Sequence, residues 1–104
     1  MTTITGPRIK NVERPTFATM TACNEMSDLI EAATKLAEQA RVLGLRSTAE
    51  QVRRIAAQLD VMRTVLIAEG DQHMPVAVAY IDVCADRLAV HGGYVGRCAH
   101  DQRR

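Results

Sequence analysis

Segment 44–50, with the sequence GLRSTAE, constrains the fold more than any other part of this chain. Gly44 follows a long run of apolar residues at helical spacing, and glycine readily takes the left-handed conformation that closes a helix. Leu45 can then fold back onto the last turn of that helix. Ser47, with Glu50 three residues later, predicts an N-cap and a capping box for a second helix. Two helices joined this tightly are expected to lie antiparallel.

Apolar residues at steps of three and four predict three helices in all. The first covers about Thr19 to Leu43, and the second covers about Thr48 to Glu69. The third runs from its cap at Asp71 to about His91, before the glycine pair at positions 92 and 93. Its first half is apolar without a break, and a helix that is apolar on most sides is either central or covered by a partner.

We therefore predict an all-α fold: a small antiparallel bundle of three main helices with an extended N-terminal arm and a short C-terminal tail. Residues 1–18 form the arm, residues 19–91 form the bundle, and residues 92–104 form a tail that is irregular or a short fourth helix. The chain has 104 residues, which suits a single domain with one core.

Charge and cysteine content narrow the classes of function. The formal net charge is +1, so no overall field indicates nucleic acid or an acidic substrate. No apolar run reaches the length of a membrane span, so no membrane role is expected. The three cysteines (Cys23, Cys84 and Cys98) are an odd number and too few for a disulfide scaffold. A reduced, cytoplasmic setting fits them best.

Acidic and basic residues occur in alternating blocks along the chain, which predicts a surface patched in both signs. Three helices of this size cover only part of the apolar surface, so burial by a partner or a second copy is expected. We predict a non-catalytic protein that binds another protein, as a homodimer, and that needs no cofactor. The residues expected to contact the partner are Arg41, Arg46, Arg53, Arg54, Arg63, Tyr80, Asp82 and Asp86.

Nucleic-acid binding or regulation is the first alternative. Ala40 and Gly44 resemble the alanine and the turn glycine of a helix-turn-helix motif, and four of the arginines above cluster near that turn. The apolar positions of the following helix, Val52 and Ile55, are out of register with the motif. A helical hairpin therefore explains Gly44 without DNA.

A small all-α enzyme is the second alternative. No nucleophile–base pair is apparent, and residues 92–97 lack the lysine and the strand that give a phosphate loop its function. A zinc site is a further possibility, with the ligands Cys84, His91, Cys98 and His100 brought together if the tail folds back. Their spacing matches none of the common zinc patterns, so no metal is expected.

In length, helix content and lack of a catalytic signature, the whole chain resembles the small accessory proteins of phages and mobile elements. The helical anti-CRISPR inhibitors are the best-defined group among these. The resemblance rests on no specific motif and transfers no residue roles. It implies a protein that occupies a surface of a CRISPR effector or nuclease and blocks nucleic-acid binding or recruitment.

Overall fold

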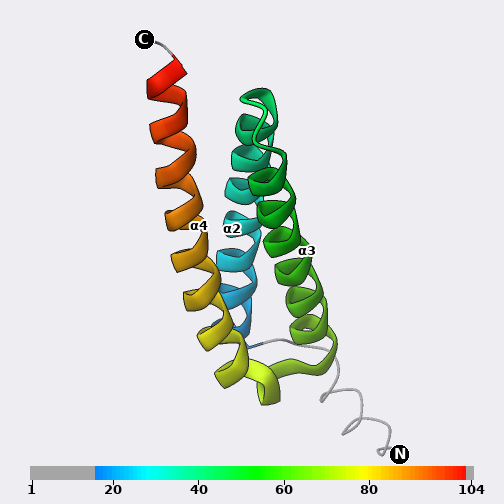
Figure 1. The fold of residues 1–104 in the computed structure, drawn as a ribbon. Helices are drawn as coiled ribbons and strands as arrows, with labels where there is room; N and C mark the ends of the chain where they lie inside the picture. Colours follow the sequence, from blue (N-terminus) through cyan, green and yellow to red (C-terminus); the bar gives the residue numbers. More distant parts are fainter. Residues whose placement is uncertain (1–15, 103–104) are drawn as a thin grey trace, which may run out of the picture.

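The computed structural model of the chain describes residues 16–102, and within these residues the fold is all-α (Figure 1). Helix α2 (Phe17–Val42) and helix α3 (Arg46–Glu69) form an antiparallel hairpin. A 3-10 turn, η1 (Gly70–His73), leads into α4 (Met74–Gln102), which runs beside both helices. The all-α prediction is confirmed for this part of the chain. None of the described helices is long and apolar enough to cross a membrane.

The tight turn between α2 and α3 has the conformation predicted for Gly44 and Leu45. Gly44 has a φ of 80°. Its N–H donates to the carbonyl of Arg41 at 3.0 Å, and the N–H of Leu45 donates to the carbonyl of Ala40 at 2.8 Å. These two bonds define a Schellman motif, in which a left-handed residue satisfies the last carbonyls of a helix. Leu45 also packs against the cluster of Ala40, Ala49 and Val95, of which Ala40 belongs to the last turn of α2.

The predicted capping box at Ser47 is wrong. Helix α3 already begins at Arg46, and its N-cap is Leu45, which makes no side-chain capping bond. The Schellman turn ends at Leu45, so α3 starts at once and Ser47 lies inside its first turn. The Ser47 hydroxyl accepts a hydrogen bond from Gln51 instead, at 3.2 Å.

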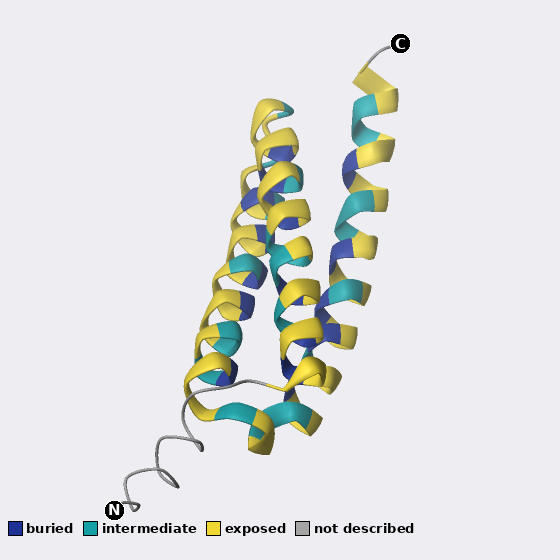
Figure 2. Ribbon diagram, turned by 180° about the vertical axis from the view of Figure 1, so that it is seen from behind, coloured by how far each residue is buried: buried dark blue, intermediate teal, exposed yellow. Residues whose placement is uncertain are grey.

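The core lies between the three helices, and α2 contributes mostly small residues to it. Figure 2 shows the buried positions of each helix facing inward. The α2 side of the main cluster includes Ala33 and Ala37, which face larger residues such as Leu59 on α3 and Leu88 on α4. A smaller cluster near the α2–α3 turn joins Ala40, Ala49 and Val95. Helix α4 leans away from the hairpin toward its C-terminal end (Figures 1 and 2), where Val95 is its main buried contact.

The predicted helix boundaries need two corrections. Helix α2 begins at Phe17, so the end of the region assigned to the arm is helical. The remainder of the predicted arm, residues 1–15, lies outside the described residues. Helix α4 does not stop at the glycine pair: it continues without interruption to Gln102, so the described part of the tail is neither irregular nor a separate fourth helix. Val95, which follows the glycines, packs in the core, and its burial stabilises the continued part of α4.

Asp71 does not cap α4 as predicted. It lies inside η1, and its carboxylate accepts hydrogen bonds from the hydroxyl of Thr16, at 2.9 Å, and from that of Thr19. Thr16 is the N-cap of α2, and its hydroxyl also accepts from the backbone N–H of Thr19 at 3.1 Å. The α3–α4 turn is thereby tied to the start of α2, where a carboxylate also favours the helix dipole.

Candidate functional site

The arginines that the sequence places around the first turn occupy different surfaces of the molecule. Arg41 donates to Glu38 at 3.1 and 2.5 Å, and these bonds hold the pKa of Glu38 below its usual value. The charge of Arg53 adds to this effect, which places Arg53 across from Glu38 on the α2–α3 side. Arg53 and Glu38 line the same groove, of about 820 Å³, between these two helices. Arg41 itself is exposed, but its guanidinium is already paired with the carboxylate of Glu38.

Arg54, the next residue along α3, lines a groove on the side of α4. Its guanidinium lies 3.9 Å from Glu50, and both side chains are mostly exposed, so this ion pair contributes little. Arg46 is exposed at the first turn of α3. The antiparallel packing of α2 on α3 differs from the roughly perpendicular crossing of a helix-turn-helix unit.

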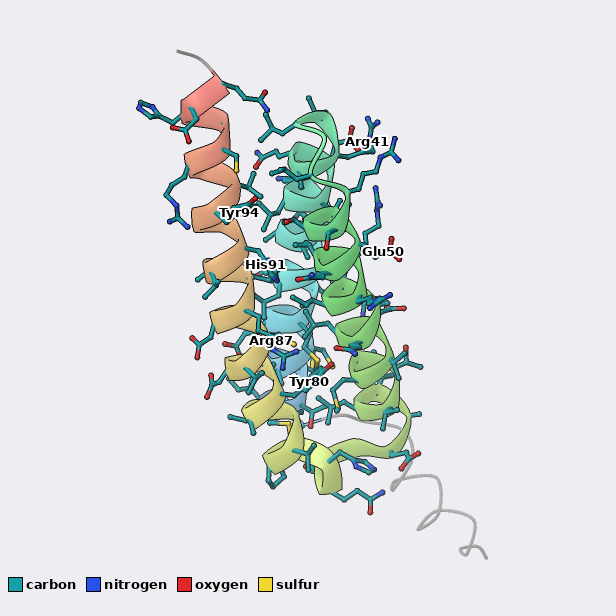
Figure 3. All side chains as sticks on the ribbon, viewed as in Figure 1. Arg41, Glu50, Tyr80, Arg87, His91 and Tyr94 are labelled. Carbon is teal, nitrogen blue, oxygen red and sulfur yellow. The ribbon has the colours of Figure 1, made fainter. Side chains whose placement is uncertain are left out.

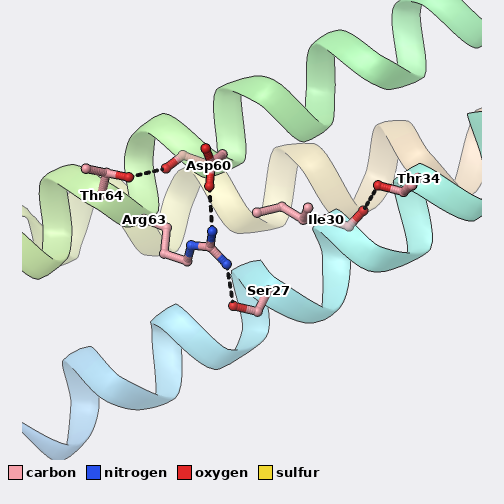
Figure 4. A network of polar contacts seen from close by, with 6 residues as sticks. All are labelled: Ser27, Ile30, Thr34, Asp60, Arg63 and Thr64. Atoms are coloured by element: carbon pink, nitrogen blue, oxygen red, sulfur yellow. Dashed lines mark hydrogen bonds and ion pairs between the residues drawn. The ribbon is translucent and has the colours of Figure 1, made fainter.

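Arg63, one of the residues expected to contact a partner, forms part of a network between α2 and α3. Its guanidinium donates to Ser27 of α2 at 2.8 Å and to Asp60 at 2.5 Å (Figure 4). Only 31% of its side chain is exposed. Because it joins the two helices of the hairpin, Arg63 has a structural role that its sequence position did not reveal.

A groove between α3 and α4 brings together cationic side chains from these two helices. It has a volume of about 410 Å³ and is lined by Gln51, Arg54, Ile55, Gln58, Arg87 and His91. Figure 3 shows Arg87 and His91 on the side of α4 that is turned toward α3, whereas Arg41 and Glu50 lie at the opposite edge of the molecule. Among the described residues, neither Arg87 nor His91 has a recorded ion pair.

A second, apolar groove continues along the same two helices. It also has a volume of about 410 Å³, and its lining comprises Ala57, Gln58, Val61, Met62, Val65 and Tyr80. Gln58 belongs to both grooves, and its side-chain oxygen accepts a hydrogen bond from the hydroxyl of Tyr80 at 2.7 Å. The two grooves are therefore adjacent halves of one surface, with a basic half and an apolar half. We call this surface the α3–α4 groove.

The sequence predicted Arg54 and Tyr80 of this groove as contact residues and named His91 only as a possible zinc ligand, but it did not single out Arg87 or Gln58. The signal on α4 was present, because Tyr80, Arg87 and His91 are separated by seven and four residues and so share one side of a helix. Their facing partners on α3 required the tertiary structure. The two predicted acidic contacts, Asp82 and Asp86, are exposed on α4 and line none of these grooves.

The cysteines and histidines of α4 are held apart by the helix. Cys84, His91 and Cys98 are successively seven residues apart, which on a continuous helix is a rise of about 10 Å per step, too far for shared zinc ligation. Within residues 16–102 no group of three or more metal-ligating residues is found. Burial raises the pKa of the Cys84 thiol, so this side chain is a neutral core residue.

Comparison of the chain with protein-family models, curated proteins and solved structures gives no match.

Proposed function

We propose that this chain is a non-catalytic protein that acts by binding another protein and that it pairs with a second copy of itself. The outer side of α4 carries the proposal. Val76, Val83 and Val90 are 59%, 46% and 71% exposed, although the opposite side of the same helix forms the core. Residues seven apart lie on one side of a helix every two turns, so these valines form an apolar row open to solvent. Such a row is typical of a surface that a protein covers.

The valine row has the symmetry that a second copy would require. It covers 14 residue steps along α4, from Val76 to Val90, or about 21 Å of helix. An antiparallel pairing of two α4 helices centred on Val83 would place Val76 of one copy beside Val90 of the other. The row is thus complementary to itself, as a two-fold interface demands. A second copy would also complete the bundle on the side where α4 has no neighbour.

Charged residues around this scaffold would select a different protein partner. Arg41, Arg46 and Arg53 near the first turn, and Asp82 and Asp86 on α4, are exposed. Charges at the rim of an interface steer encounter and suppress wrong partners. A role as an accessory protein of a phage or mobile element, such as an anti-CRISPR-type inhibitor, is consistent with this proposal. It requires only a stable helical scaffold that presents a binding surface.

We also propose that the protein resides in a reducing compartment such as the cytoplasm and that it uses no cofactor. Cys23, Cys84 and Cys98 are all free thiols in the structure. Free thiols persist in reducing compartments, whereas secreted proteins tend to oxidise them.

Light scattering on the full chain tests the pairing. We expect a mass of twice 11.4 kDa for the wild type and a shift toward the single-chain mass for Val83→Glu. Ile67→Glu is the matched control, because Ile67 is 56% exposed but lies on α3, outside the valine row. A wild type that remains monomeric at high concentration, or equal effects of both variants, would refute the pairing. An affinity pull-down from the native host would then identify the other partner, and a salt-dependent shift with duplex DNA would favour nucleic acid instead.

A further inference from the structure

One end of the α3–α4 groove is lined by basic side chains and is therefore suited to an acidic ligand. Arg54 and Arg87 approach it from opposite helices, and His91 lies one turn beyond Arg87. Within residues 16–102, the carboxylate at ion-pair distance from Arg54 is that of Glu50, at 3.9 Å. Because this contact is long and exposed, it leaves most of the hydrogen-bonding capacity of the Arg54 guanidinium available.

The other end of the groove is mostly apolar and is therefore suited to an apolar ligand. Val61, Met62 and Val65 line it from α3, and the ring of Tyr80 closes it from α4. Val61 is 63% exposed. Methionine is flexible and polarisable, so Met62 can adapt its packing to an incoming side chain. The hydrogen bond from Tyr80 to Gln58 holds the ring in place between the two ends.

We propose that the α3–α4 groove docks an amphipathic helix of a partner protein, with acidic side chains facing Arg54 and Arg87 and apolar side chains facing Met62. This inference rests on the proposed protein-binding function and assigns the site and the chemistry of the partner. The groove lies between two antiparallel helices, which is the position that a further helix of a bundle occupies. Ile55 and Met62, one in each half, are seven residues apart on α3, so the two kinds of ligand side chain should be about two turns apart.

The apolar half favours a peptide over nucleic acid as the occupant. A phosphate backbone would pair with Arg54 and Arg87 but would leave Val61, Met62 and Val65 uncovered. Binding by phosphate contacts also relies on many cationic side chains, whereas the chain as a whole has a net charge of only +1. An amphipathic helix satisfies both halves at once.

The test uses the full isotope-labelled chain and a synthetic helical peptide of about 14 residues, with two leucines at one end and two glutamates about two turns away. Two matched peptides replace the glutamates by lysine or the leucines by serine. Amide proton–nitrogen spectra recorded during titration would report binding even when it is weak. We expect shifts concentrated at groove residues such as Gln51, Arg54 and Arg87 with the first peptide, and much smaller shifts with the other two.

Charge variants test whether the peptide binds in this groove and not elsewhere on the surface. We expect the double variant Arg54→Gln, Arg87→Gln to bind the glutamate peptide about tenfold more weakly. Arg97→Gln is the matched control, because Arg97 is also an exposed arginine of α4 but lines neither half of the groove. Circular dichroism of each variant would show that the helices are retained.

Three results would overturn the proposal: no localised shifts, equal binding of the lysine peptide, or equal weakening by Arg97→Gln. The same groove shifts with a single-stranded oligonucleotide, and none with the glutamate peptide, would assign the groove to nucleic acid. The outcome is separable from that of the pairing experiment. A monomeric wild type that binds the peptide would refute the pairing alone, and a monomeric Val83→Ser chain that binds no peptide would refute the docking alone.

Discussion

Two glycines of this chain should respond in opposite directions to the same substitution. At Gly44 the φ is 80°, and no atom lies within 4 Å of an added Cβ, so alanine there meets backbone strain and no clash. A left-handed alanine costs about 1–2 kcal/mol, and reduced freedom of the unfolded chain offsets about 0.5 kcal/mol of this. Gly44→Ala should therefore lower the free energy of unfolding by about 1 kcal/mol.

Gly93 lies within the continuous helix α4, and its added Cβ would meet only the Nη1 atom of Arg97, at 3.6 Å. This is an ordinary contact with a flexible side chain. Alanine is more favourable than glycine in a helix interior by about 0.5–1 kcal/mol. Gly93→Ala should therefore raise the free energy of unfolding by that amount.

Urea denaturation followed by far-ultraviolet circular dichroism measures both changes. The two variants should differ by about 2 kcal/mol, or roughly 10 °C in Tm for a domain of this size. A Gly93→Ala variant that is less stable than the wild type would refute the reasoning, because the glycine pair would then interrupt α4. Equal stability of Gly44→Ala and wild type would show that the turn does not need its left-handed residue.

Two further predictions concern the ends and the core of the bundle. Asp71→Ala should lower the free energy of unfolding by about 1 kcal/mol in denaturation experiments, since it removes the acceptor for Thr16 and Thr19. Asp71→Asn keeps an acceptor and should lose less stability. Equal losses in the two variants would show that the negative charge of Asp71, and not its role as an acceptor, stabilises the fold. Burial raises the pKa of Cys84 in the folded state, so the native chain retains a proton that the unfolded chain has released, and stability should decline above about pH 8.5. In Cys84→Ala this alkaline decline of the unfolding free energy should be smaller, and an unchanged decline would contradict the assignment.

Local backbone rules predicted the α2–α3 turn well because its determinants are adjacent in the sequence. Gly44 and Leu45 complete hydrogen bonds to carbonyls three and five residues earlier, so no distant partner decides the outcome. The same rules failed at Ser47, where a good capping residue was present but the helix had already begun. Two local signals competed for one short segment: the Schellman turn ends at Leu45, so α3 begins before Ser47 can cap it.

The polar contacts between helices could not be predicted, because each depends on which faces meet. Arg63 resembles any exposed helical arginine in the sequence, yet Ser27 of α2 lies 36 residues away and receives its hydrogen bond. An aspartate just before a helix is typical of an N-cap, but the carboxylate of Asp71 accepts hydrogen bonds from Thr16 and Thr19 at the start of α2. The α3–α4 groove likewise combines residues from two helices whose register only the tertiary structure defines.

Both proposed surfaces lie on α4, and helical geometry brings them into competition. Tyr80 and Arg87 are three residues before and four residues after Val83, so at 100° per residue they lie about 60° and 40° round the helix from it. Neighbouring helices pack with axes about 8–10 Å apart, so a helix docked in the groove would overlap the space of a second α4 on the valine row. Pairing and docking would therefore exclude one another at least in part. Self-association would cover the apolar surface of the free protein, and a tighter-binding partner would release it.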